Sequence, residues 1–275
     1  MRTSMLSLSC GQIEILESMG TGPAVLLCHG NSAAAEVFSD WLAGPLGARY
    51  RLIAMSFPGH GASTPAADPA QDYTIARLGE VAVEVVAALG LHHYALLGQS
   101  LGGHALLETL DCFAGACGLV LLSAPPLSLD TLSEAFLPDP SGGLLFTGAL
   151  TSDEARQLAG CFVADPAAGT WQSLLPLILR TDPAFRPALL ASLQQGAMRD
   201  ERSCLARAPW PVAGLCGSAD RFLRQGAASA VPADIWWRGG PVQLAGAGHA
   251  LQLDAPAASA DLVAAYLAER FAPGA

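Results

Sequence analysis

The stretch Gly98-Gln99-Ser100-Leu101-Gly102-Gly103 decides the fold. An apolar run typical of a buried strand precedes it at residues 94–98, and an apolar segment that suits a helix follows at residues 101–110. A Gly-x-Ser-x-Gly sequence at such a turn holds the serine in a strained backbone conformation, and small residues two positions before and after it relieve the crowding. The pattern therefore predicts that Ser100 is a nucleophile exposed above a sheet edge. A serine that only caps a helix is the alternative, but it would not explain the flanking glycines.

A serine hydroxyl is a weak nucleophile until a neighbouring base removes its proton. His249 is the predicted base, because it follows the last predicted strand in Gly246-Ala247-Gly248-His249 and precedes the C-terminal helix. Its loop can return over Ser100. His104, one helical turn beyond the serine, is interpreted as a packed helix residue, and His60 as a residue of a glycine-rich loop that could line a pocket.

The base needs an acid to orient it, and in the chain order serine, acid, histidine this acid lies between the other two. Asp220 is the predicted acid, since it follows the apolar strand at residues 212–216. A helix cap is its alternative role. Asp234 is the second candidate for the acid, and Asp254 is interpreted as a cap for the helix that begins near Pro256.

Acyl transfer also requires hydrogen-bond donors fixed around the developing oxyanion. The backbone N–H of Leu101, at a helix N-terminus, is one predicted donor. Asn31 is the other, through its backbone N–H or its side chain, because it follows the early strand at residues 24–28 in His29-Gly30-Asn31-Ser32.

Short apolar runs bounded by turn residues alternate with helical patterns, which predicts helices around a mostly parallel sheet. Strands are expected at residues 6–8, 13–16, 24–28, 51–56, 94–98, 119–123, 212–216 and 242–245, and helices at residues 73–89 and 256–271. Residues 123–211 are too long for a single crossover helix, and they carry helical patterns at residues 152–162, 171–179 and 187–198. We therefore expect a core formed by residues 1–124 and 208–275 and a helical cap formed by residues 125–207.

Composition limits the function. Hydrophobic residues make up 52% of the 275 residues and charged residues only 14%, which excludes intrinsic disorder. The 14 basic residues against 24 acidic ones give a net charge of -10, so we expect neither nucleic acid nor a membrane surface as a partner. The N-terminus lacks the continuous apolar stretch of a secretory signal, which predicts a cytoplasmic protein.

No metal or cofactor is expected. The chain has no His-Glu-x-x-His pattern, no Cys-x-x-Cys pair and no phosphate-binding loop. The seven cysteines are interpreted as reduced, buried, small hydrophobic residues. The oligomeric state is left open.

Taken in order, these motifs resemble the α/β-hydrolase family over nearly the whole chain. The motifs are His29-Gly30-Asn31, the loop Phe57-Pro58-Gly59-His60-Gly61, the turn at Ser100, the acid Asp220 and Gly248-His249. The resemblance implies the α/β-hydrolase fold, a mostly parallel central sheet flanked by helices, with the helical cap inserted between the strands near 119–123 and 212–216.

Further motifs are similar to those of N-acyl homoserine lactonases of the α/β-hydrolase type: Ser100-Leu101-Gly102-Gly103-His104, Ser123-Ala124-Pro125-Pro126 and Arg180-Thr181-Asp182. This similarity implies a serine hydrolase that opens an apolar lactone or ester through an acyl-enzyme. The residues expected to contact such a substrate are His29, Gln99, Phe136, Phe146 and Trp171.

Two alternatives stay open. A general carboxylesterase, or a hydrolase of carbon–carbon bonds, would use the same triad and differ in its cap contacts. A ligand receptor on a hydrolase scaffold would keep the triad but turn over slowly.

Overall fold

A computed structural model describes residues 1–138, 140–228 and 231–273. Within these residues eight strands form one sheet in the order β1-β2-β4-β3-β5-β6-β7-β8. The pairs β1/β2 and β2/β4 are antiparallel and all other neighbours are parallel. The strands are β1 (Arg2–Leu8), β2 (Gly11–Glu17), β3 (Ala24–Cys28), β4 (Arg51–Met55), β5 (Tyr94–Gln99), β6 (Ala116–Leu122), β7 (Ala213–Gly217) and β8 (Val242–Leu244).

The central strands are apolar on both faces because both faces are covered. Successive residues of β3 belong to different clusters: Val25 and Leu27 to one, Leu26 and Cys28 to the other. Cys28 pairs with Gly98 of β5, and Gly98 pairs with Leu121 of β6. The carboxyl ends of β3, β5 and β6 therefore meet at one edge of the sheet, which is where ligands bind in folds of this kind.

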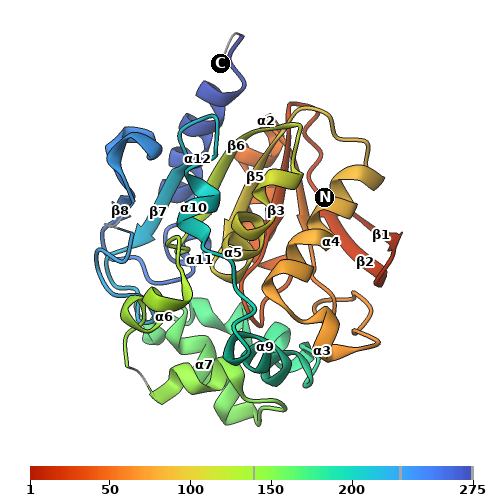
Figure 1. Ribbon diagram of the computed structural model, residues 1–275, viewed down its shortest axis with the longest axis vertical. Coiled ribbons are helices and arrows are strands. Elements are labelled where there is room, and N and C mark those ends of the chain that lie inside the picture. Colours follow the sequence, from red (N-terminus) through yellow and green to blue (C-terminus); the bar gives the residue numbers. More distant parts are fainter. Residues whose placement is uncertain (139, 229–230, 274–275) are drawn as a thin grey trace.

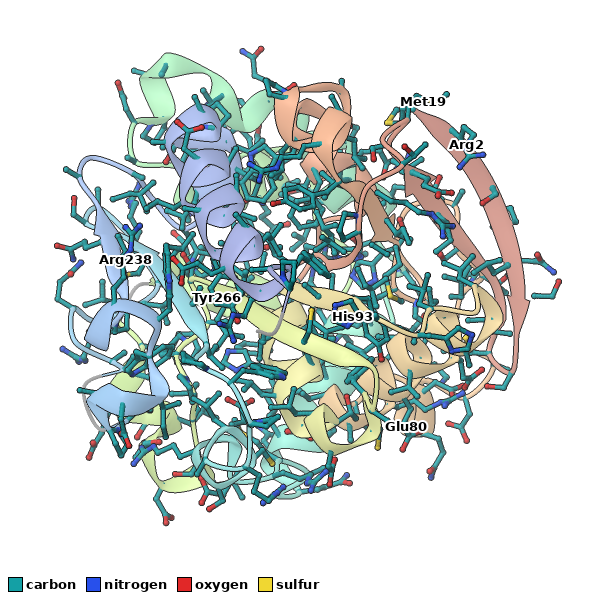
Figure 2. The ribbon with its side chains drawn as sticks, turned by 90° about the horizontal axis from the view of Figure 1, so that it is seen from above. Arg2, Met19, Glu80, His93, Arg238 and Tyr266 are labelled. Carbon is teal, nitrogen blue, oxygen red and sulfur yellow. The ribbon has the colours of Figure 1, made fainter. Side chains whose placement is uncertain are left out.

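The core helices cover the sheet on two sides. They are α1 (Ser39–Ala43), α2 (Pro45–Arg49), α3 (Pro69–Asp72), α4 (Ile75–Ala88), α5 (Leu101–Glu108), α11 (Leu251–Asp254) and α12 (Pro256–Arg270). Helix α4 packs against α5, and α12 packs against β6. Tyr266 of α12 is fully buried, whereas Arg2 and Met19 lie at the edge of the molecule beside β1 and β2 (Figure 2). The Tyr266 hydroxyl accepts a hydrogen bond from the N–H of Leu119 at 3.0 Å, which fixes α12 to the sheet.

The chain between β6 and β7 carries five α-helices in the described residues. These are α6 (Leu129–Ala135), α7 (Ser152–Cys161), α8 (Leu175–Arg180), α9 (Phe185–Gln194) and α10 (Glu201–Leu205). Helices α6, α7 and α9 gather at the end of the molecule opposite the C-terminus (Figure 1). The single helix expected at residues 171–179 is instead a 3₁₀ turn, η5 (Thr170–Ser173), followed by α8. Pro176 lies in the first turn of α8, where its missing N–H is tolerated, and this starts a new helix.

The other 3₁₀ turns are η1 (Ala35–Phe38), η2 (Leu110–Cys112), η3 (Pro140–Phe146), η4 (Pro166–Ala168), η6 (Ala233–Ile235) and η7 (Trp237–Gly239). The seven cysteines are all free, as expected, but the prediction that all are buried was wrong. Cys112 is exposed, because it follows α5 in a surface turn. In the described residues no helix is both long and apolar enough to span a membrane.

Candidate active site

Ser100 lies in a sharp turn between β5 and α5. Its backbone has φ 50° and ψ -120°, a conformation that costs a residue with a side chain of the order of 1 kcal/mol or more. Its N–H donates to the carbonyl of Leu122 at 2.8 Å, and its own carbonyl accepts the N–H of Gly103 at 2.8 Å. A Cβ at Gly98 would clash with the backbone of Gly103, and one at Gly102 with the carbonyl of Cys28. Small residues at these two positions therefore allow the turn.

Asp220 and His249 form a buried pair. Nδ1 of His249 lies 2.8 Å from Oδ2 of Asp220, and both side chains are almost fully inaccessible to solvent. Oδ1 of Asp220 accepts the N–H groups of Phe222 at 2.8 Å and Leu223 at 3.1 Å. Burial raises the pKa of Asp220, but the charge of His249 and these hydrogen bonds outweigh it and hold the pKa below its usual value. An ionised Asp220 selects the tautomer with a proton on Nδ1 and leaves Nε2 free to act as a base.

The competing acid is elsewhere. Asp234 lies in η6, on the exposed segment before β8. Asp220 is therefore the one of the two candidates that the chain brings to His249.

The loop that carries His249 contacts the segment between β6 and β7. The His249 ring packs between Phe222 (ring centroids 4.9 Å apart) and Phe162 of the cap segment (5.7 Å). Oδ2 of Asp254 accepts the N–H of Gly248 at 2.7 Å and the N–H of Ala164, which follows α7, also at 2.7 Å. The interpretation of Asp254 as a helix cap was wrong, because Ala255 occupies the cap position of α12 and no side chain caps it.

Asn31 is in the loop after β3. It lines the same cavity as Ser100. Its Nδ2 donates to the carbonyl of Leu145 in the cap at 3.0 Å, and its Oδ1 accepts the Ser32 hydroxyl at 2.7 Å. These two hydrogen bonds fix the side chain of Asn31, and its backbone N–H is the donor that we assign to the oxyanion. The N–H of Leu101, the first residue of α5, has no acceptor within its own helix.

An apolar cavity of about 480 Å³ extends from these residues to the helices between β6 and β7. Its lining includes Phe136 and Phe146, as expected from the sequence. The full lining is Asn31, Ile75, Ser100, Leu101, His104, Leu127, Leu132, Ser133, Phe136, Leu137, Pro138, Gly142, Leu145, Phe146, Phe162, Leu189, Leu190, Leu193, Gln194, Met198, Phe222 and His249.

Three expected contact residues lie outside this lining. His29 is fully buried, with Nδ1 donating to the carbonyl of Gly30 at 2.7 Å and Nε2 accepting the N–H of Phe57 at 3.0 Å. Burial lowers the pKa of His29 to about 4, so it is a neutral structural residue. Gln99 is buried at the end of β5, with Oε1 against Gly30. Trp171 donates its indole N–H to the carbonyl of Pro166 at 2.7 Å, within the outer part of the cap.

His60 is also absent from the lining, since it is buried against Phe185 with ring centroids 4.3 Å apart. Phe222, which lines the cavity, and Arg186, which lies behind the Asn31 loop, were not predicted. Phe222 could have been found from its place two residues after the acid. Arg186 of α9, which binds the Asn31 loop through Ser32, gave no sequence signal.

Comparison with known proteins identifies the family of the chain. The model of a family described as "Alpha/beta hydrolase family" matches residues 25–262, so the chain belongs to the α/β hydrolase family. The predicted family and fold are thereby confirmed.

A curated relative is the pimeloyl-[acyl-carrier protein] methyl ester esterase of Methylococcus capsulatus. It is 28% identical over 229 residues, which span 76% of this chain and 80% of the relative. Among solved structures, the N-acyl homoserine lactonase AidH in complex with N-butanoyl homoserine is 28% identical, with a TM-score of 0.94 over 100% of this chain and 99% of that one. A mutant of the same lactonase with N-hexanoyl homoserine lactone gives a TM-score of 0.93 at 28% identity, over 98% and 99% of the two chains. The protein is a hydrolase that acts on ester bonds.

Proposed function

We propose that this protein opens the lactone ring of N-acyl homoserine lactones through an acyl-enzyme formed on Ser100. The observation that carries the proposal is the apolar cavity, which begins at Ser100 and His249 and extends between the core and the cap. The similarity to a lactonase supports it further, because it extends over the cap as well as the core.

In this mechanism Nε2 of His249 takes the proton of the Ser100 hydroxyl, and Oγ of Ser100 attacks the lactone carbonyl. Asp220 holds the imidazole in the required tautomer and stabilises the imidazolium. The N–H groups of Asn31 and Leu101 stabilise the oxyanion. The leaving alkoxide, protonated by His249, stays attached to the acyl group, so attack of water on the ester of Ser100 then releases a single hydroxy acid.

Residues 125–207 act as the cap in this proposal. Phe136 and Phe146 lie on the cavity wall and would contact the acyl chain of the substrate. The substrate is thus a small apolar lactone, and the expected place of action is the cytoplasm.

The test is to incubate the purified protein with N-acyl homoserine lactones of increasing chain length and to follow the ring-opened acid by mass spectrometry. Ring opening that is lost in Ser100→Ala is the expected result. Cleavage of short aryl esters without any ring opening would reject the lactone substrate.

A carboxylesterase acting on open-chain esters is the second candidate. The curated relative, a methyl ester esterase of 28% identity, favours it. Methyl and aryl esters of the same acyl chains, assayed beside the lactones, separate the two, since a dedicated lactonase has the higher kcat/KM on the ring.

A further inference from the structure

One buried polar side chain of the cavity has no part in the proposed chemistry. Six lining residues have polar side chains: Asn31, Ser100, His104, Ser133, Gln194 and His249. Ser133 and Gln194 are exposed, and three others belong to the proposed reaction. His104, which is 7% exposed, remains.

The ring of His104 is held in place by a hydrogen bond between its Nδ1 and the carboxylate of Glu201. Its Nδ1 lies 2.9 Å from Oε1 and 3.0 Å from Oε2 of Glu201, which is completely buried at the start of α10. Oε2 of Glu201 also accepts the N–H of Leu127 at 2.8 Å. Nδ1 therefore donates to the carboxylate. No residue in the described part of the chain is hydrogen-bonded to the other ring nitrogen, Nε2.

The pKa of His104 is shifted in the direction opposite to that expected for a buried histidine. Burial lowers the pKa of His104, but the charge of Glu201, its hydrogen bond and the nearby Glu108 outweigh burial and raise the pKa above its usual value. A protonated ring presents Nε2–H as a charged donor, and such a donor without an acceptor in an apolar cavity is costly.

His104 also lies at a defined place relative to the nucleophile. Its N–H donates to the carbonyl of Ser100 at 3.2 Å, so the two residues are one helical turn apart, and both line the same cavity. This separation corresponds to roughly 6 Å along the helix axis. A ligand acylating Ser100 would thus have a second polar group within reach of His104 only if that group were a few bonds from the scissile carbonyl.

We propose that His104 is a specificity-determining residue whose Nε2–H donates to a second carbonyl oxygen of the substrate, an amide or ketone a few bonds from the ester. Glu201 is the positioning residue that directs this donor into the cavity. The inference rests on the proposed hydrolysis at Ser100, and it defines the substrate class as esters or lactones with such a carbonyl.

The experiment compares matched substrate pairs. One pair is N-hexanoyl homoserine lactone and an alkyl γ-lactone of similar length without the amide. The other is the 4-nitrophenyl ester of N-hexanoylglycine and 4-nitrophenyl octanoate. The measured quantity is the ratio of kcat/KM within each pair. We expect His104→Phe to lower the ratio on the order of 10- to 100-fold, mainly through KM of the carbonyl-bearing member.

Gln195→Leu is the control, because Gln195 is exposed directly after α9 and lies outside the lining of the cavity. It should leave both ratios within about twofold of the wild-type value. Equal loss of activity on both members of a pair in His104→Phe, or no change in either ratio, would overturn the proposal. If the wild type cleaves the aryl esters but no lactone, the lactonase function fails while the aryl pair still tests His104.

Glu201→Gln provides the second variant in case His104→Phe does not fold. The amide keeps a neutral acceptor for Nδ1 but removes the charge that favours the protonated ring. The pH above which the preference for the carbonyl-bearing ester is lost should therefore move to lower values. His249 serves both substrates, so its contribution cancels in the ratio, and Glu108 is the other carboxylate that acts on the ring of His104. A merely structural role for the pair predicts no such movement.

Discussion

Nε of Arg186 donates to the hydroxyl of Ser32 at 2.8 Å, across 154 positions of the chain. The same guanidinium donates to the carbonyls of Gly148 and Ile178, each at 2.8 Å, and the residue is 1% exposed. In the described residues it forms no ion pair. Burial lowers the pKa of Arg186 to about 10, so it remains charged at neutral pH. The cap thus places an uncompensated positive charge behind the loop that carries Asn31.

Arg186→Met should therefore weaken both catalysis and stability. Loss of the charge and of the Ser32 contact is expected to reduce kcat by about 10- to 100-fold with a smaller change in KM. The three unpaired acceptors should lower the free energy of unfolding by about 2–4 kcal/mol. Steady-state kinetics and thermal unfolding measure the two effects. The control is Arg180→Met, which changes an exposed arginine of the same cap. If Arg186→Met kept the wild-type kcat, the proposed role of its charge would be contradicted.

The strain at Ser100 predicts an unusual order of stability. Ser100→Ala keeps a Cβ in the positive-φ conformation, whereas Ser100→Gly removes it. We expect the glycine variant to be more stable than the alanine variant by about 1 kcal/mol, although glycine usually destabilises. Thermal unfolding of the two inactive proteins under identical conditions measures the difference. A less stable glycine variant would mean that the turn stores no strain.

The two candidate acids can be separated by one comparison. Asp220→Asn removes the charge that orients His249, and a loss in kcat of the order of 10⁴-fold is expected. Asp234→Asn changes an exposed side chain and should leave kcat unchanged. Both are measured with the same ester. Comparable losses in the two variants would reject the assignment of Asp220.

Glu108 makes stability fall as the pH rises. Burial and the neighbouring Glu201 raise the pKa of Glu108 to about 7, and it also faces His104 and Arg199. Because the folded state holds this proton more tightly than the unfolded state, stability is lost between the unfolded pKa of about 4.5 and about 7. His104, whose pKa is also raised, acts in the same direction.

Glu108→Gln should reduce this loss in the free energy of unfolding by about 2 kcal/mol. Denaturant unfolding at pH 5 and pH 8 tests it: the variant should gain relative to the wild type at pH 8 and differ little at pH 5. Glu80→Gln, an exposed change on α4, should leave the pH dependence as it is. A wild-type pH dependence in Glu108→Gln would contradict the assignment.

The core of the fold was predictable because its strands are continuous apolar runs. The strand predicted at residues 24–28 matches β3 at both ends, since turn residues bound it. The turn at Ser100 was equally clear, because the close approach of β5 to α5 requires small residues at fixed offsets. Such local constraints are visible in a sequence.

The cap was predictable only as a group of helices. Phe146 and Trp171 are both aromatic residues of its short helices, yet Phe146 lines the cavity and Trp171 does not. Which face a short helix turns inward depends on its neighbours, not on its own periodicity. Arg186 was not predictable for the same reason, since its partners come from segments more than 30 residues away as well as from α8.

The single carboxylate of Asp254 has a consequence for engineering this enzyme. One of its oxygens accepts the N–H groups of both Gly248, beside the proposed base, and Ala164, which follows α7. A cap transplanted from another member of the family to change the substrate would have to supply an N–H at the position of Ala164. Without it Asp254 would no longer join the His249 loop to the segment after α7, so the cap and the loop of the base should be exchanged, or redesigned, as one unit.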